Sequence, residues 1–250
     1  MSEGKVLLVT GGSRGIGAEI ARKGARKGYR VAVNYAASAD AAAAVVEAIA
    51  AEGGEAIAIR ADVGSEADIL AMFAEVDRRF GRLDALANNA GIVGHKARLD
   101  EMDLARLERT MRVNVLGSML CAREAVRRMS TRHGGRGGAI VNLTSVAALL
   151  GSAHMYVDYA ASKGAIDSFT IGLAREVAAE GIRVNAVRPG IIDTDIHASS
   201  GLPNRVADTI DIIPMKRPGT AAEVAAAVLW LLSEEASYAA GSILTVAGGR

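Results

Sequence analysis

Short runs of apolar and β-branched residues alternate along the chain with longer segments whose apolar positions recur at the helical period. This alternation is typical of β-α-β units that build a parallel sheet. The predicted strands are apolar almost throughout, as expected where helices cover both faces of a sheet. No linker-like or repeated segment interrupts the pattern. We therefore predict one α/β domain over residues 1–250, with a doubly wound parallel sheet of about seven strands.

The pattern assigns an approximate range to each element. Strands are predicted at Lys5–Thr10, Arg30–Asn34, Ala56–Arg60, Leu83–Asn88, Ala139–Thr144, Arg183–Arg188 and Ser242–Val246. Helices are predicted at Gly15–Lys27, Ala39–Glu52, Glu66–Phe80, Asp103–Ser130, Tyr156–Glu180 and Ala221–Leu232, with caps such as Ser65 and Thr220. The stretch from Pro189 to Pro214 fits no regular pattern. We expect residues 191–215 to form a substrate lid, and the loop Val93–Leu99 to complete the pocket.

The composition indicates a folded chain whose net charge is too small to attract its partners. Half of the residues are hydrophobic and 23% are charged, so a sizeable core can be buried. Lys and Arg number 29 against 28 Asp and Glu, a formal net charge of +1. Such a balance provides no general attraction to nucleic acid or to an anionic membrane. The four histidines lack acidic or cysteine partners at ligand spacing, so we expect a small-molecule site and no metal.

The cysteine content and the N-terminal sequence bear on the cellular compartment. Cys121 is the only cysteine, which excludes a disulfide within the chain and favours a reducing compartment. Its neighbours Leu120 and Ala122 predict a small core residue rather than a nucleophile. The first residues lead directly into an apolar strand without a signal-peptide pattern, and no apolar run is long enough to span a membrane. The expected location is the cytoplasm.

A glycine-rich turn, Thr10–Gly17, follows the first predicted strand and opens a helix. Its glycines remove the Cβ atoms that would keep the backbone away from a pyrophosphate, and the free amides of the helix start point towards that group. A tight structural corner is the alternative interpretation, but the position at the start of the β-α-β series favours a Rossmann-type dinucleotide site. No Gly-Lys-Ser/Thr ends the turn, which excludes a phosphate-loop ATPase. The predicted cofactor residues here are Gly11, Ser13, Arg14, Gly15, Ile16 and Gly17.

The end of the second strand predicts which dinucleotide is bound. An acidic residue there would accept hydrogen bonds from a free ribose 2′-hydroxyl and repel a 2′-phosphate. The segment from Asn34 to Ser38 contains no acid, and the first one is Asp40. Arg14 can pair with a 2′-phosphate unless it is simply a solvated loop cation. We therefore predict NADP in preference to NAD, which stays the alternative, with Asn34 and Ser38 at the site.

Tyr159 and Lys163 open a long predicted helix and lie four residues apart, on one helical face. Such a spacing is weak evidence alone. Ser145 follows a predicted strand and Asn114 lies in the preceding helical segment, and loops after strand ends are where a doubly wound sheet gathers its ligands. These four residues are the predicted catalytic set.

The chemistry of hydride transfer gives each residue a role. A hydride that moves between a nicotinamide and a carbonyl carbon must be matched by a proton at the oxygen. Tyr159 can supply it if the neighbouring Lys163 cation lowers its pKa, by about 1–3 units. Ser145 can donate a hydrogen bond to the substrate oxygen, and Asn114 can hold a water or backbone group in a proton relay. Tyr156 lacks a lysine four residues on and is expected to shape the pocket.

Together these motifs resemble the short-chain dehydrogenase/reductase family over the whole chain. The matching pieces are Thr10–Gly17, Asp62-Val63, Asn88-Asn89-Ala90-Gly91, Asn114, Ser145, Tyr159-x-x-x-Lys163 and Arg188-Pro189-Gly190 followed by Thr194. The resemblance implies that Asp62 and Val63 contact the adenine and that Ile192 and Thr194 meet the nicotinamide carboxamide. It also implies that Lys163 holds the nicotinamide ribose. The same motifs place further residues along the cofactor, namely Asn88, Asn89, Ala90, Gly91, Tyr159, Pro189 and Gly190.

The resemblance also bears on assembly and on substrate. The family usually forms tetramers, so a homo-oligomer is expected. One departure is Ala247, which stands where an acidic residue is more common and is expected to affect packing near the tetramer interface more than catalysis. The resemblance is strongest to 3-oxoacyl carrier-protein reductases and glucose dehydrogenases. The substrate stays open among an acyl thioester, a sugar and a small ketone, and a catalytically idle dinucleotide-binding sensor or scaffold is the alternative function.

Overall fold

The structure is a computed structural model of the chain, and it describes residues 4–194 and 209–250. Its centre is a sheet of seven parallel strands in the order β3-β2-β1-β4-β5-β6-β9. The strands are β1 (Val6–Val9), β2 (Arg30–Tyr35), β3 (Ala56–Arg60), β4 (Ala85–Asn88), β5 (Gly138–Leu143), β6 (Ile182–Pro189) and β9 (Ile243–Val246). The predicted doubly wound α/β sheet is confirmed. The strand order reverses between β1 and β4, which is where such sheets bind their ligands.

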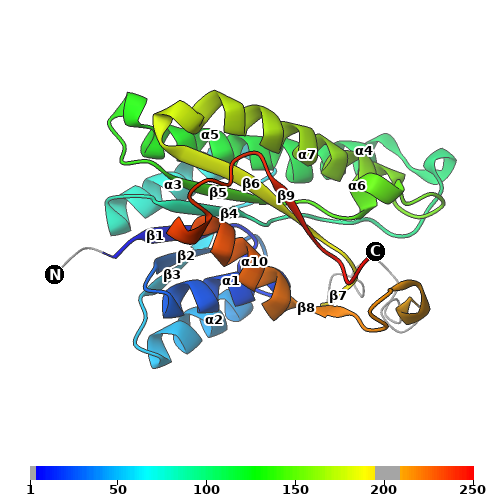
Figure 1. Ribbon diagram of the computed structural model, residues 1–250, viewed down its shortest axis with the longest axis horizontal. Helices are drawn as coiled ribbons and strands as arrows, with labels where there is room; N and C mark the ends of the chain where they lie inside the picture. The colour runs from blue at the N-terminus through cyan, green and yellow to red at the C-terminus, as the bar shows by residue number, and fades with distance from the viewer. Residues whose placement is uncertain (1–3, 195–208) are drawn as a thin grey trace.

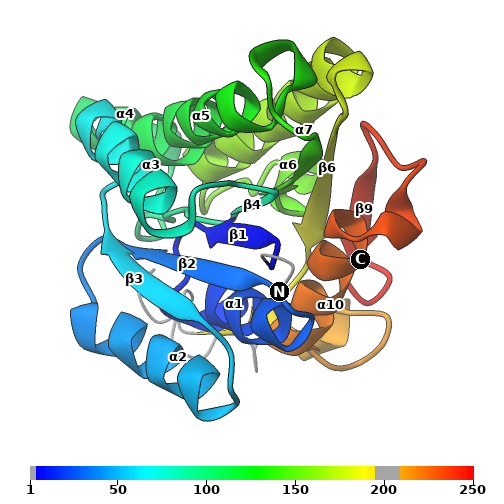
Figure 2. The same ribbon diagram turned by 90° about the vertical axis from the view of Figure 1, so that its left-hand side faces the viewer.

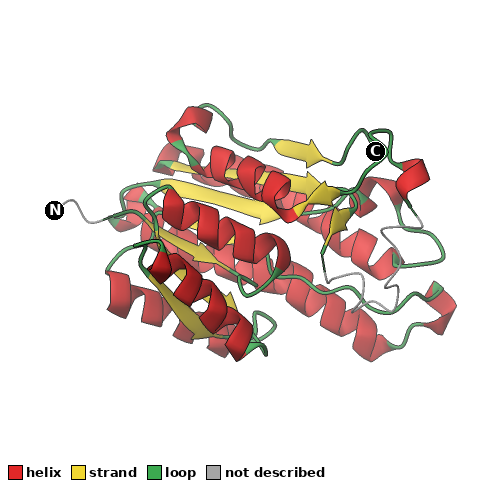
Figure 3. Ribbon diagram, turned by 90° about the horizontal axis from the view of Figure 1, so that it is seen from below, coloured by secondary structure: helices red, strands yellow, loops and turns green. Residues whose placement is uncertain are grey.

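Helices cover both faces of the sheet (Figures 1 and 2). One face carries α1 (Gly15–Arg26), α2 (Ala39–Ala51) and α10 (Ala221–Leu232). The other carries α3 (Glu66–Phe80), α4 (Leu104–Met111), α5 (Ser118–Met129) and α7 (Val157–Val177). Short 3-10 turns occupy Leu99–Glu101, Thr131–His133, Ala178–Glu180, Ile210–Ile212 and Glu234–Ala236. The view from below in Figure 3 shows the layered arrangement of strands and helices.

Strand β1 illustrates how the two cores form. Side chains of a strand alternate between the faces of the sheet. Leu7 and Val9 accordingly pack into the core beneath α1 and α10, while Val6 and Leu8 pack into the core beneath α3 and α5. All four are fully buried. This explains why the predicted strands are apolar throughout rather than alternating.

Several sequence predictions of detail are confirmed. Ser65 caps α3 by accepting a hydrogen bond from the amide of Asp68, and Thr220 caps α10 in the same way through Glu223. Cys121 is fully buried, and burial raises the pKa of its thiol to about 12, so it is a core residue. Within residues 4–194 and 209–250, no helix combines the length and apolar character needed to cross a membrane.

The helix predicted over Asp103–Ser130 is confirmed as one helical path from Leu104 to Met129, but its middle is not regular α-helix. The structure divides it into α4, a π-helical segment at Arg112–Gly117 and α5. In a π-helix each amide bonds five residues back, which widens the turn, and such turns occur often at functional sites. The hydrophobic periodicity of the sequence cannot distinguish this wider turn from a turn of regular α-helix. The π segment contains Asn114.

The stretch predicted to be irregular contains regular structure at both of its ends. Strand β6 runs on to Pro189, and a small parallel ladder pairs β7 (Ile192–Asp193) with β8 (Gly219–Thr220). This ladder, the short helix α6 (Ala147–Leu150) and the chain's C-terminus lie together at the carboxyl ends of the strands, on the right of Figure 1. Of the predicted lid, residues 195–208 lie outside the described residues.

Candidate active site

The glycine-rich turn is built as a backbone cradle. Gly11 and Gly15 have φ of +61° and +53°, a region that favours glycine. A Cβ on Gly17 would lie 2.2 Å from the Gly11 carbonyl oxygen, so no larger residue fits there without movement. Asn89 closes the turn from the end of β4, because its Nδ2 donates to the carbonyls of Thr10 and Gly11 at 2.9 and 3.0 Å. The turn therefore leaves its main chain open to an anionic ligand.

A long groove extends from this turn and gathers the predicted cofactor residues from separate strand ends. The residues that line it include Gly11, Ser13, Arg14, Gly15, Ile16, Gly17, Asn34, Ser38, Asp62, Val63, Asn89, Ala90, Gly91 and Thr194. Arg14 and Ser38 are exposed in this lining, and the side chain of Arg14 makes no hydrogen bond or ion pair with other described residues. We call this feature the cofactor groove.

Two predicted residues use their side chains for hydrogen bonds within the fold. The Asn34 side chain is buried: its Oδ1 accepts from the Gly11 amide at 3.1 Å and its Nδ2 donates to the Ala61 carbonyl at 3.0 Å. Asn34 thus braces the turn rather than presenting its amide to a ribose phosphate. Asn88 is also buried, and its Nδ2 donates to the Ser118 carbonyl and to Asn142. The expectation that Asn88 lines the groove is wrong, because its neighbour Asn89 takes that position.

The part of the cofactor groove beside Asp62 contains a residue that the sequence did not predict. Arg109, on α4, donates from Nη2 to Asp62 Oδ2 at 2.8 Å and lines the groove. A Cβ on Gly64 would lie 2.4 Å from Arg109 Nη1, so the guanidinium packs against the main chain there. Asp62 and Arg109 are 47 residues apart and belong to no common motif, so no sequence signal identified the pair.

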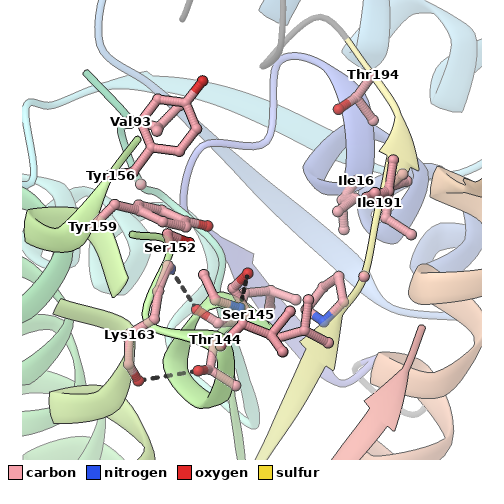
Figure 4. A pocket seen from close by; sticks show the side chains of 18 of the residues that line it. Ile16, Val93, Thr144, Ser145, Ser152, Tyr156, Tyr159, Lys163, Ile191 and Thr194 are labelled. Atoms are coloured by element: carbon pink, nitrogen blue, oxygen red, sulfur yellow. Dashed lines mark hydrogen bonds between the residues drawn. The ribbon is translucent and has the colours of Figure 1, made fainter. Parts of the chain in front are cut away.

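A second cavity adjoins the groove and contains three of the four predicted catalytic residues (Figure 4). Ser145 follows β5, whereas Tyr159 and Lys163 come from the first turns of α7. In Figure 4, Ile16, Ile191 and Thr194 lie across the cavity from Tyr156, Tyr159 and Lys163. The predicted site residues in this cavity are Ile16, Asn89, Gly91, Ser145, Tyr159, Lys163, Pro189, Gly190, Ile192 and Thr194. We call it the reaction cavity.

The cofactor groove and the reaction cavity are continuous. Ile16, Asn89, Gly91 and Thr194 line both of them. One elongated ligand can therefore lie with one end near Arg14 and Ser38 and its other end beside Tyr159.

Lys163 is buried and holds its ammonium group by one backbone contact. Its Nζ donates to the Leu143 carbonyl at 2.7 Å and lies 5.6 Å from the centre of the Tyr159 ring. Burial lowers the pKa of Lys163 to about 8, although the nearby Asp167 charge raises it. The main chain of Lys163 is fixed as well, because its carbonyl accepts from Thr144 Oγ1 at 3.1 Å.

The expected lowering of the Tyr159 pKa is wrong for this structure. Burial raises the pKa of the phenol above its ordinary value, and a hydrogen bond with Ser145 offsets only part of that rise. The physical reason is that the neighbouring lysine is itself desolvated and directs its Nζ to the Leu143 carbonyl. Tyr159 is thus a protonated phenol at neutral pH.

Asn114 lies behind the reaction cavity rather than in it. It is fully buried, its Oδ1 accepts from the Ile92 amide at 2.8 Å, and its Nδ2 donates to the Ile92 carbonyl at 2.9 Å and to Ser162 Oγ at 3.1 Å. Asn114 therefore holds a backbone group, which is one of the two roles predicted for it. A Cβ on Gly91 would lie 3.4 Å from both Asn114 Oδ1 and Lys163 Nζ, so the amide and the ammonium flank one point of the main chain.

The remaining walls come from loops that the sequence assigned only in part. Val93 and Tyr156 line the reaction cavity as expected, whereas Leu99 does not. Arg250 also lines it and was not predicted. Ala247 packs against Gly190 of the cavity wall, where a Cβ on Gly190 would lie 2.8 Å from the Ala247 Cα. Among the described residues, His, Cys, Asp and Glu form no cluster that could hold a metal ion.

Comparison with known proteins gives consistent matches over the whole chain. Residues 11–250 match the family described as enoyl-(acyl carrier protein) reductase. An uncharacterized oxidoreductase of Escherichia coli (strain K12) is 52% identical over 98% of this chain and 99% of its own. Glucose 1-dehydrogenase 2 of Bacillus subtilis (strain 168) is 39% identical over 98% of this chain and 94% of its own. The crystal structure of a short chain dehydrogenase from Burkholderia cenocepacia J2315, in complex with NADP, superposes with a TM-score of 0.91 at 38% identity, covering 99% of this chain and 98% of that one.

Proposed function

Because the chain belongs to the short-chain dehydrogenase/reductase family of oxidoreductases, we propose that it is an NADP-dependent enzyme that interconverts a carbonyl and a secondary alcohol by hydride transfer. One observation carries the proposal. The side chains of Tyr159 and Ser145 both line the cavity that adjoins the cofactor groove. A dinucleotide in that groove would place its nicotinamide ring beside the residues that can transfer the proton.

The residues fit a dinucleotide on structural grounds. The turn at Gly11–Gly17 exposes main chain where a Cβ would block it, and α1 starts at Gly15 with its free amides directed at the groove. Lys163 in the reaction cavity and Thr194 at its junction with the groove would hold the nicotinamide end, and Asp62 with Val63 the adenine end. When bound, NADPH supplies the hydride that reduces the carbonyl carbon.

The protein side chains then bind and protonate the oxygen atom of the substrate. Ser145 donates a hydrogen bond to the carbonyl oxygen, and Tyr159 donates its proton as negative charge develops there. Lys163 lies close enough to stabilise the tyrosinate that results. Asn114 contributes by fixing the main chain at Ile92 and the helix at Ser162.

The protonation of Tyr159 favours carbonyl reduction at neutral pH. Burial raises the pKa of the phenol, so it is ready to act as an acid. Alcohol oxidation requires the tyrosinate instead, and its rate should increase with pH. This asymmetry agrees with a role in NADPH-linked reduction.

The cofactor groove supports NADP over NAD. Asn34 to Ser38 contain no carboxylate that would repel a 2′-phosphate, and the exposed Arg14 and Ser38 flank this part of the groove. A charge-assisted contact from Arg14 would add affinity for the phosphate. The similar Burkholderia cenocepacia protein was crystallised in complex with NADP.

The reaction cavity supports an apolar carbonyl substrate over a sugar. Among the described residues its walls include the aliphatic side chains of Val93, Val146, Leu150, Ile191 and Ile192, beside further polar residues such as Ser152, Tyr156 and Arg250. A sugar would leave several hydroxyl groups desolvated without partners against such walls. An apolar ketone or a 3-oxoacyl thioester fits them better.

We also propose that the protein works as a single-domain homotetramer in the cytoplasm. Large apolar side chains are exposed on α4 and α5, at Leu104 and Met119, and again near the far edge of the sheet, at Trp230 and Leu244. Two separate apolar faces suit an assembly with two kinds of contact. Light scattering coupled to size-exclusion chromatography measures the mass directly, and a monomer would contradict this proposal.

A substrate screen tests the proposed activity. Aliphatic and aromatic ketones, 3-oxoacyl thioesters and sugars are each incubated with the protein and NADPH, and the loss of NADPH absorbance is followed. We expect turnover of apolar ketones or thioesters and little with sugars. Tight NADPH binding without turnover of any carbonyl class would instead favour the catalytically idle sensor or scaffold.

A further inference from the structure

We propose that Arg106 and Asp158 are positioning residues whose buried ion pair clamps the start of α7, and with it Tyr159, to helix α4 and to the loop that lines the reaction cavity. The inference rests on the proposed function, because it assigns these residues a part in aligning the proton donor with the carbonyl substrate. Neither residue lines the reaction cavity, so neither is a catalytic residue.

The contact between the two side chains is bidentate. Arg106 Nε donates to Asp158 Oδ2 at 2.9 Å and Nη2 donates to Oδ1 at 3.2 Å. Only 1% of the Asp158 side chain and 18% of the Arg106 side chain are exposed. Forked arginine–carboxylate pairs fix both distance and orientation, which a lysine in the same place cannot do. The pair therefore sets geometry as well as charge.

Asp158 is held ionised by several donors at once. Burial alone would raise the pKa of this carboxyl, but the hydrogen bonds from Arg106 and from the Tyr159 amide lower it below its ordinary value. Thr110, one turn along α4, donates to the same Oδ2 at 3.3 Å. The residue before Tyr159 is thus fastened to α4 at two points.

The same guanidinium reaches the wall of the reaction cavity. Arg106 Nη1 donates to the His95 carbonyl at 2.7 Å, and a Cβ on Gly94 would lie 2.8 Å from Arg106 Nε. The loop main chain therefore packs directly on the arginine, next to Val93 of the cavity wall. Arg106 connects the substrate wall with the helix that carries the proton donor.

The clamp continues along one stripe of α4 and the π segment. Arg106, Thr110 and Asn114 are each four residues apart, and the first two contact Asp158 while Asn114 contacts Ser162. Asp158 and Ser162 lie one turn apart on α7 and directly precede Tyr159 and Lys163. The π segment lets Asn114 continue the stripe towards α7.

A pair elsewhere in the chain offers a matched control. Arg82 and Asp84 also form a bidentate ion pair, with 22% and 10% of their side chains exposed. They precede β4, at the opposite end of the strands from the reaction cavity. Arg82→Gln removes a comparable charge contact without touching the clamp, so it separates a loss of stability from a loss of alignment.

The test compares Arg106→Gln, Arg106→Lys and Arg82→Gln in steady-state kinetics and in NADPH binding. For both Arg106 variants we expect kcat with a reducible ketone to fall about 10- to 100-fold, because a small misplacement of a reacting group costs about that much. The Kd for NADPH should not change, and Arg82→Gln should keep the parent kcat. Unchanged kcat in folded Arg106→Gln, or loss of NADPH binding together with kcat, would overturn the proposal.

Hydrogen exchange tests the clamp without a known substrate. Amides in 92–97 and 157–163 should exchange faster in Arg106→Gln than in the parent, while those of the glycine-rich turn should keep their protection. Exchange that rises uniformly over the chain, or not at all in these two segments, would contradict the clamp. An absence of carbonyl turnover in the unaltered protein would count against the proposed function alone.

Discussion

The cofactor groove and the reaction cavity meet at four residues, yet they are built in different ways. The groove is formed mostly by main chain and small side chains that follow the ends of β1, β2, β3 and β4. The reaction cavity is formed by larger side chains from loops distant in sequence, such as Val93, Leu150 and Ile191. The first surface follows from the backbone path, whereas the second depends on which side chains the loops bring together.

This difference separates binding from selectivity. A groove made of backbone accepts any ligand with the same phosphate skeleton, so its specificity depends on a few peripheral side chains such as Arg14. A cavity made of side chains changes its specificity with each substitution. Mutations in the two regions should therefore affect cofactor affinity and turnover independently.

The largest expected effect separates chemistry from binding. Tyr159→Phe removes the proton donor of the reaction cavity and keeps the ring, so kcat should fall by about 10³-fold or more. The Kd for NADPH, measured by fluorescence titration, should stay that of the parent. Tyr156→Phe is the control in the same cavity and should retain most of the activity. Near-normal turnover in Tyr159→Phe would contradict the role assigned to this residue.

A mutation in the cofactor groove should weaken cofactor binding, which Tyr159→Phe leaves unchanged. A Cβ on Gly17 would collide with the Gly11 carbonyl, so Gly17→Ala must distort the turn. We expect NADPH affinity to drop about 10- to 100-fold and the free energy of unfolding to fall by about 1–3 kcal/mol. The control is Gly172→Ala in α7, where no neighbouring atom lies within 4 Å of the added Cβ. If both variants bind NADPH like the parent, the turn is not the phosphate cradle.

A smaller effect should appear at the edge of the groove. Arg14→Ala removes the exposed cation near Ser38, and we expect kcat/KM for NADPH to fall about 10-fold, as for the loss of one charge-assisted contact. The value for NADH should change little. Initial rates with both cofactors measure this preference. An equal loss with NADPH and NADH would show that Arg14 does not recognise the 2′-phosphate.

The last expected effect concerns the stability of the fold rather than turnover, and it depends on pH. The folded-state pKa of Lys163, about 8, lies below the ordinary value of 10.5. Below pH 8 the lysine is protonated in both states, and the lowered pKa corresponds to a penalty of about 3 kcal/mol for the buried charge. Between pH 8 and 10.5 the unfolded chain binds more protons, so this penalty disappears as pH rises. A substitution of Lys163 would also remove its bond to the Leu143 carbonyl, worth about 1 kcal/mol.

Lys163→Met should therefore stabilise the fold by about 2 kcal/mol at pH 7, and this gain should decrease as pH approaches 10.5. Urea unfolding of parent and variant at several pH values measures the difference. A gain that persists unchanged at high pH would place its origin in packing rather than in the buried charge. The variant should also lose activity. Lys163 would then serve catalysis while lowering the stability of the fold.

The sequence predicts the cofactor groove better than the reaction cavity, for a physical reason. Glycine spacing after a strand determines a backbone path locally, so Gly11 to Gly17 are identifiable as a turn before any contact is known. Tyr159 and Lys163 are similarly linked by one helical turn. The order of strands and helices follows from periodicity, although the extra residue per turn in the π segment leaves no periodic signal.

The features that the sequence does not predict depend on contacts across the fold. Whether Asn34 points into the groove or under the turn is decided by the carbonyls of a neighbouring strand. The contacts of Arg109 with Asp62 and of Arg250 with the cavity join segments distant in sequence. The raised pKa of Tyr159 depends on burial, and a four-residue spacing cannot report burial. Each of these required three-dimensional coordinates.

The central claim is that a single dinucleotide passes from the cofactor groove into the reaction cavity and presents its ring to Tyr159. A crystal structure of the protein with NADP tests it most directly. The claim predicts the adenosine phosphate near Arg14 and Ser38, and the nicotinamide C4 facing the Tyr159 hydroxyl across a gap that one carbonyl group fills, about 3–3.5 Å from each reacting atom. A nicotinamide that lies outside the reaction cavity, or a Tyr159 hydroxyl turned away from it, would contradict the account.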